Sequence, residues 1–139
     1  MMYGQRIPIK TRDEVRKMRV ASRHVAEILL ELREMVLPGV TTKELDDAAE
    51  KMISERGVVS SFKGYGPQGL PEYPAVLCVS VNEEIVHGIP GLRTLEEGDI
   101  VGLDFGVRDR NAAVEPFDAA VLEAFGMTSF ATLVPGGRK

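Results

Sequence analysis

The sequence predicts an α+β fold in which two amphipathic helices cover one face of a β-sheet. Apolar residues at helical spacing dominate the chain up to Gly57. Short segments rich in β-branched residues, bounded by glycine, proline and asparagine, follow. Each amphipathic helix must bury its apolar face on another element, so helices followed by strands are typical of a layered α+β domain.

The first helix is predicted to begin at Thr11 and to end before Pro38-Gly39. Thr11 and Glu14 form a capping box, in which a hydroxyl and a carboxylate satisfy free backbone N–H groups at a helix start. Apolar residues then recur three or four positions apart, which places them on one face. They are Val15, Met18, Ala21, Val25, Ile28, Leu32 and Met35.

The second helix is predicted to begin at another capping box, formed by Thr41 and Glu44, and to end at Gly57. Its apolar stripe contains Leu45, Ala49, Met52 and Ile53.

Three strands are predicted after the helices, in residues 58–62, 75–81 and 99–107. The segment "KGYGPQGLPEYP" between the first two is too rich in glycine and proline for regular structure. Residues 116–125 keep helical spacing and predict a short helix, and residues 126–139 are expected to form an irregular tail.

Composition limits the class of protein. A chain of 139 residues with 44% hydrophobic and 27% charged residues is typical of one globular domain. Its net charge of -4 argues against a nucleic-acid partner, because phosphate binding needs a basic surface. The single cysteine, Cys78, excludes an intramolecular disulfide and suits a reducing compartment. The sequence contains neither a membrane-spanning apolar run nor a signal peptide, so we expect a cytoplasmic protein without a membrane partner.

Asp104 is the first candidate for chemistry, because it lies in the apolar segment "GDIVGLDFGV". Strand alternation places Gly102 and Gly106 on the same face as Asp104, which leaves space beside its carboxylate. A buried carboxylate needs a cation, a hydrogen-bond network or a raised pKa. Asp104 is therefore either a metal-binding or catalytic residue, or an aspartate paired with an arginine or with backbone N–H groups.

His87 and Cys78 are weaker candidates when each is taken alone. His87 lies in "NEEIVHGIPG", between a strand end and a turn. Such a position can hold a side chain rigidly and leave it open to substrate. The alternative is that His87 has a structural role or is simply exposed. Cys78 is either a small buried hydrophobic residue or part of a pocket wall. Nothing near Cys78 in the sequence would lower its pKa, which argues against a nucleophilic role.

Taken together and in order, four segments resemble the type I methionine aminopeptidases. They are "IKTRDEVRKMRVASRHVAEIL", "PGVTTKELD", "VSVNEEIVHGIPG" and "LEEGDIVGLDFGV". The resemblance implies the amino-terminal half of a pita-bread fold, with a mostly antiparallel sheet, in residues 1–107, followed by a divergent tail in residues 108–139. It implies metal-dependent removal of the initiator methionine from nascent polypeptides.

The resemblance also implies roles for individual residues. His87 matches the histidine that contacts the substrate and stabilises the scissile amide in the transition state, and Asp104 matches a metal-binding aspartate. Tyr73 and Cys78 match residues that line the pocket for the methionine side chain. Two divalent cations, such as Co, Mn, Fe or Zn, activate a bridging water in this family. The loop before Tyr73 is longer than the family pattern, so Tyr65 has no secure counterpart.

The sequence departs from the family after Val107. A segment such as "DGxxGDxAxTF", with a second metal-binding aspartate, is expected there, but the chain has "RDRNAAVEPFDAAV". Glu115 has a suitable distance from Asp104 and different surroundings, so it is only a candidate second ligand. No histidine follows His87, and the later glutamate motifs are absent. We therefore expect incomplete metal binding and little or no peptidase activity, and hypothesise a frameshift or truncation after Val107.

Two alternatives to the enzyme follow from the same departure. One is a non-catalytic module that binds a polypeptide end or a partner protein through Tyr73, Cys78 and His87 without metal. The other is a half-domain whose exposed sheet edge and apolar face lead to self-association.

Overall fold

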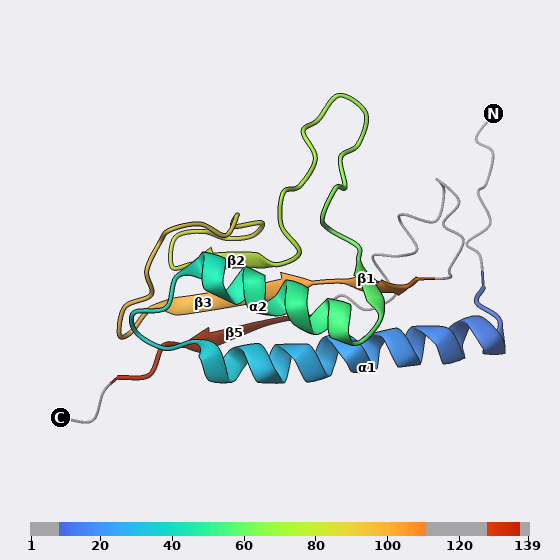
Figure 1. Cartoon of the computed structure of the whole chain (residues 1–139), viewed down its shortest axis with the longest axis horizontal. Helices are drawn as coiled ribbons and strands as arrows, with labels where there is room; N and C mark the ends of the chain where they lie inside the picture. Colours follow the sequence, from blue (N-terminus) through green and yellow to red (C-terminus); the bar gives the residue numbers. More distant parts are fainter. Residues whose placement is uncertain (1–8, 111–127, 137–139) are drawn as a thin grey trace.

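The computed structural model describes residues 9–110 and 128–136. Helix α1 spans Arg12–Met35 and helix α2 spans Thr42–Glu55. The two helices contact each other and pack against the strands, with α1 against β4 (Val107–Asp109) and α2 against β1 (Val58–Ser60) (Figure 1). The predicted α+β layering is confirmed.

Both predicted capping boxes form at the helix starts. The backbone N–H of Thr11 donates to Glu14 Oε2 at 2.6 Å, and the N–H of Glu14 donates to Thr11 Oγ1 at 3.2 Å. Thr41 and Glu44 repeat this arrangement, with distances of 2.8 and 3.2 Å. Two orphan N–H groups are thereby satisfied at each start, which fixes where each helix begins.

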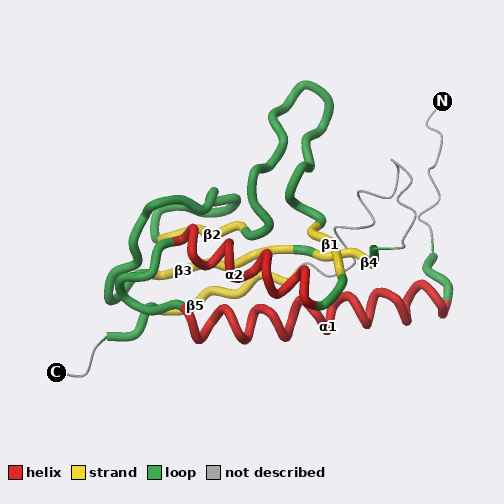
Figure 2. Tube along the Cα trace, viewed as in Figure 1, coloured by secondary structure: helices red, strands yellow, loops and turns green. Residues whose placement is uncertain are grey.

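The strands form two antiparallel sheets. Strands β1 and β4 make a two-stranded sheet, and β2 (Cys78–Val81), β3 (Ile100–Phe105) and β5 (Thr128–Leu133) make a three-stranded sheet in the order β2-β3-β5 (Figure 2). The segment predicted as one strand, residues 99–107, is divided at Gly106 between these sheets. The division lets one continuous segment pair with β2 and β5 before Gly106 and with β1 after it.

Strand β5 corrects the prediction of an irregular tail over residues 126–139. Residues 128–133 pair with β3 along its whole length, in a register from Thr128 opposite Phe105 to Leu133 opposite Ile100. The physical reason is the second edge of β3, whose backbone groups need partners that β2 cannot supply. The helix predicted for residues 116–125 lies outside the described residues.

The core lies between the helices and the strands. On β3, the side chains of Val101, Leu103 and Phe105 are fully buried, while Ile100 on the alternating face is exposed. This alternation is the one that the sequence predicts, and it leaves Asp104 on the face away from the core. In the part of the chain that the structure describes, neither helix is long and apolar enough to cross a membrane.

Candidate functional site

A pocket of about 530 Å³ brings the sequence-predicted residues Tyr73, Cys78, His87 and Asp104 together. Strand β2 supplies Cys78, strand β3 supplies Asp104, and the loops that flank β2 supply Tyr73 and His87. The other lining residues are mostly apolar. They are Ser61, Phe62, Tyr65, Pro67, Leu70, Pro71, Glu72, Pro74 and Ile89.

Asp104 and Cys78 are neighbours across the sheet. They lie opposite each other in the antiparallel register of β2 and β3, so their side chains share one face. Cys78 is only 3% exposed, and burial raises the pKa of its thiol, which therefore stays protonated at neutral pH. Cys78 is thus both a buried small residue and a pocket wall, and the protonated thiol argues against a nucleophilic role, as expected from the sequence.

The carboxylate of Asp104 makes no hydrogen bond or ion pair with any side chain or backbone group that the structure describes. The pairing with an arginine or with backbone N–H groups, left open by the sequence, is therefore not found within residues 9–110 and 128–136. Burial raises the pKa of Asp104, and the nearby His87 opposes this shift. A partly buried carboxylate without a hydrogen-bonding or ion-pair partner destabilises the folded state, and such a group is typical of a functional site.

Replacing Asp104 by asparagine is expected to stabilise the protein at pH 7 by on the order of 1 kcal/mol. A carboxyl group whose pKa is higher in the folded than in the unfolded state loses stabilising free energy as the pH rises through that interval. The stability gained by Asp104→Asn should therefore be largest at neutral pH. It should disappear below pH 3.8, the ordinary pKa of an aspartate side chain. Urea unfolding between pH 3 and pH 7 measures it.

Asp99 provides the matched control for this pH dependence. It immediately precedes β3, and its pKa is lowered because its carboxylate accepts hydrogen bonds from the Glu96 N–H and the Asn82 amide. Asp99→Asn should therefore destabilise the protein at neutral pH and lose this effect in acid, which is the opposite trend. A stability loss at pH 7 in Asp104→Asn would contradict the argument.

His87 is held in an unusual backbone conformation at the pocket mouth. Its φ is +58°, in the left-handed region that non-glycine residues rarely adopt, although histidine does so more readily than most. The next residue fixes this conformation on β2. The carbonyl of Gly88 accepts the Val79 N–H at 2.9 Å, and the Gly88 N–H donates to Ser80 Oγ at 3.1 Å. Such a constrained residue at a pocket is typical of a functional side chain.

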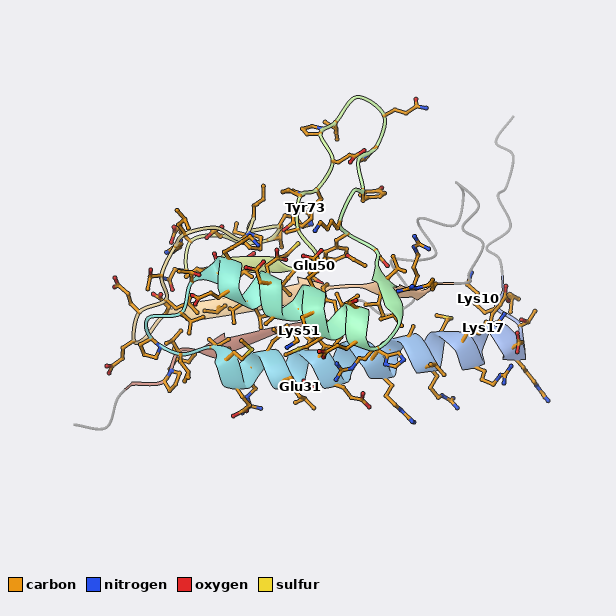
Figure 3. All side chains as sticks on the ribbon, viewed as in Figure 1. Lys10, Lys17, Glu31, Glu50, Lys51 and Tyr73 are labelled. Atoms are coloured by element: carbon orange, nitrogen blue, oxygen red, sulfur yellow. The ribbon has the colours of Figure 1, made fainter. Side chains whose placement is uncertain are left out.

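Tyr73 joins the two segments that carry Cys78 and His87. Its hydroxyl lies within hydrogen-bond distance of the carbonyl oxygens of Leu77, at 3.1 Å, and Gly88, at 3.2 Å. Burial, followed by its hydrogen bond with Cys78, raises the pKa of the Tyr73 hydroxyl well above its ordinary value, so the group remains a donor. Tyr73 lies at the base of a projecting loop (Figure 3).

Two residues in the first turns of α2 support this site and are not among the sequence-predicted ones. Asp46 Oδ1 accepts the N–H groups of Val76 and Leu77, at 3.0 and 3.1 Å, immediately before Cys78. Thr42 Oγ1 donates to the Gly91 carbonyl at 3.1 Å and accepts the Gly91 N–H at 2.9 Å. Thr42 and Asp46 are four residues apart on the buried face of α2. The sequence signal that could have identified them is this pair of polar residues at the spacing of the helix's apolar stripe.

The described residues do not form a complete set of metal ligands. Among them, no group of three or more histidine, cysteine, aspartate or glutamate side chains is placed to hold a metal ion. The backbone position opposite Asp104 on β5 belongs to Ser129, and the candidate ligand Glu115 lies outside the described residues. Asp104 can therefore contribute one carboxylate to a metal site, and the described residues do not complete such a site.

The chain is similar to aminopeptidases in sequence. Residues 16–114 match the model of metallopeptidase family M24. Methionine aminopeptidase 1 of Bacillus subtilis is 48% identical over 99 residues, which cover 71% of this chain and 38% of that protein. Methionine aminopeptidase of Clostridium perfringens is 46% identical over 102 residues, or 73% of this chain and 39% of that protein. The chain thus spans less than half the length of these relatives.

Solved structures give the same result. Methionine aminopeptidase of Thermotoga maritima has a TM-score of 0.78 at 32% identity, over 96% of this chain and 47% of that one. The enzyme from Rickettsia prowazekii has a TM-score of 0.76 at 29% identity, over 95% and 46%. The resemblance to methionine aminopeptidases and the partial pita-bread fold are confirmed. Because the family model covers more than half of the chain, this protein belongs to metallopeptidase family M24.

Proposed function

We propose that this chain carries the part of a methionine aminopeptidase site that binds the first residue of a polypeptide. The observation that carries the proposal is that Tyr73, Cys78, His87 and Asp104 line one pocket. An unbranched thioether side chain packs well against aromatic and sulfur-containing surfaces, which Phe62, Tyr73 and Cys78 supply. The names of the relatives in Bacillus and Clostridium agree with this substrate.

His87 is the residue that we assign to the scissile amide. Its side chain is exposed at the mouth of the pocket, and its backbone is fixed to β2 through Gly88. An imidazole held in this position can donate a hydrogen bond to the amide as charge develops on it. The proposed substrate is a nascent polypeptide, and the proposed location is therefore the cytoplasm.

Asp104 is the residue that we assign to a divalent cation. The family is one of metallopeptidases, and bound cations of the Co, Mn, Fe or Zn class would supply water activation. One carboxylate holds a hard divalent cation only weakly, because such ions take several oxygen ligands. We propose that the 139-residue chain alone has little or no peptidase activity.

The non-catalytic binding module remains the second candidate, because no group of three possible metal ligands is found among the described residues. It would use the same pocket for a polypeptide end but would need no cation. The two functions therefore differ in how binding responds to a chelator.

Peptide binding tests both functions. The tripeptide Met-Ala-Ser is titrated into the chain with cobalt or with chelator, and methionine release is followed in parallel. We expect binding that chelator weakens, and His87→Asn should weaken it about fivefold to tenfold through loss of one hydrogen bond. Asparagine is used because it tolerates the left-handed backbone of this position.

Ile85→Ala is the control for this experiment, since Ile85 is 91% exposed in the same loop and does not line the pocket. Binding that ignores chelator but is weakened by His87→Asn would favour the non-catalytic module. Absence of binding would contradict both candidates. Strong cobalt-dependent release of methionine, abolished by Asp104→Ala, would overturn the proposed lack of activity.

A further inference from the structure

The segment between β1 and β2, residues 63–73, projects from the rest of the fold (Figure 1) and is named the arm. Its two legs pair with each other. The Gly64 N–H donates to the Tyr73 carbonyl at 2.9 Å, and the Tyr73 N–H donates to the Tyr65 carbonyl at 2.8 Å. At the tip, the Leu70 N–H donates to the Pro67 carbonyl at 2.9 Å. The arm is thus an ordered hairpin-like element.

Gly66 allows the two legs of the arm to lie close together. A Cβ atom on Gly66 would lie 3.1 Å from both the Leu70 carbonyl oxygen and the Glu72 Cα. The legs therefore approach each other more closely than a larger residue would comfortably allow.

The base of the arm is attached to the rest of the fold. Lys63 forms an ion pair with Glu50 of α2. Phe62, which precedes the arm, packs edge to face against Tyr73, with ring centroids 6.3 Å apart. The Tyr73 hydroxyl also contacts the carbonyls of Leu77 and Gly88. Tyr73 therefore connects the arm to the segment that carries His87.

The arm lengthens the pocket beyond the part assigned to the first residue. Pro67, Leu70, Pro71 and Glu72 line the same pocket as His87 and Asp104. A polypeptide whose first side chain is held by Tyr73 and Cys78 can therefore contact these arm residues. The 64% exposed Leu70 offers an apolar contact there.

The arm places an acidic side chain, Glu72, in the pocket. Glu72 lines the pocket and forms no ion pair with the described residues, and no lysine or arginine is among the described lining residues. A cationic side chain of the bound polypeptide would be attracted to this surface, and an acidic one would be repelled.

We propose that the arm is a specificity element that binds the polypeptide segment after its first residue and favours lysine or arginine there over aspartate or glutamate. This inference rests on the proposed function, because it assumes that the first residue occupies the pocket beside Cys78. It adds Leu70 and Glu72 to the residues that contact substrate.

The test compares three ligands: methioninamide, Met-Ala-Lys-Ala and Met-Ala-Glu-Ala. Their affinities for the 139-residue chain are measured by calorimetry at low and high salt. We expect the lysine peptide to bind about fivefold to tenfold more tightly than the glutamate peptide at low salt, with a smaller ratio at high salt. Glu72→Gln should remove the difference between the two peptides.

Glu55→Gln is the matched control, since Glu55 lies on α2, outside the pocket. Leu70→Ser, at an exposed position, should weaken the binding of both peptides more than that of methioninamide. Equal affinities for the two peptides, or a difference that persists in Glu72→Gln, would overturn the arm proposal. Binding of methioninamide in the same experiment would still support the proposed function. If methioninamide does not bind but the Glu72-dependent difference is found, the charge preference at Glu72 stands, and the assignment of the first residue to the pocket beside Cys78 is overturned. Failure of all three ligands to bind overturns both.

Discussion

Replacing Gly88 by alanine is expected to lower the free energy of unfolding by about 2–4 kcal/mol and to abolish peptide binding. A Cβ atom at this position would lie 2.1 Å from the Val79 carbonyl oxygen, which belongs to the backbone of β2. A backbone atom cannot rotate away as a side chain can. The loop that carries His87 must therefore separate from β2, and the hydrogen bond from Val79 N–H to the Gly88 carbonyl is lost with it.

Gly91→Ala is the matched control, because a Cβ atom on Gly91, in the same loop, would meet no described atom within 4 Å. Its N–H and carbonyl contacts with Thr42 do not need a glycine. We expect its stability to change by less than about 0.5 kcal/mol. Chemical denaturation measures the free energy of unfolding of both variants, and titration with Met-Ala-Ser measures their peptide binding. Equal losses in the two variants would show that any side chain in this loop is harmful and would contradict the specific clash at Gly88.

Local signals account for the parts of the fold that the sequence predicts correctly. The Thr11 and Thr41 capping boxes depend on residues only three positions apart, so the sequence alone identifies both helix starts. Alternation along β3 likewise follows from its own residues. Strand β5 cannot be predicted in this way, because its existence depends on the free edge of β3, a partner distant in the sequence.

The candidate site is predicted less completely, for a similar reason. Asp104 and His87 stand out by residue type in their own segments, whereas the approach of Asp104 to Cys78 depends on the register between β2 and β3. Periodicity fixes which face a side chain takes and leaves the pairing of two strands open. The arm residues around Leu70 and Glu72 give only turn signals, since their role arises from the shape of the pocket that they share with Asp104.

Replacing Asp46 by alanine is expected to lower the free energy of unfolding by about 3 kcal/mol. Asp46 is only 5% exposed, and its Oδ1 is the acceptor for the N–H groups of both Val76 and Leu77. Alanine would leave two buried donors without a partner, and each unsatisfied group costs about 1–3 kcal/mol. Loss of the partly compensated charge, with Lys43 Nζ 3.8 Å away, offsets only part of this cost.

Asp46→Asn and Asp47→Ala separate the lost acceptor from other effects of the change. Asparagine keeps an oxygen at the Oδ1 position, so Asp46→Asn should cost less than about 1 kcal/mol and should retain binding of Met-Ala-Ser. Asp47 is adjacent, exposed and paired only with Lys43 among the described residues, so Asp47→Ala should be nearly neutral. Urea unfolding measures all three variants. If Asp46→Asn is as damaging as Asp46→Ala, the negative charge rather than the acceptor geometry holds the start of β2, and Lys43 becomes the residue to replace next.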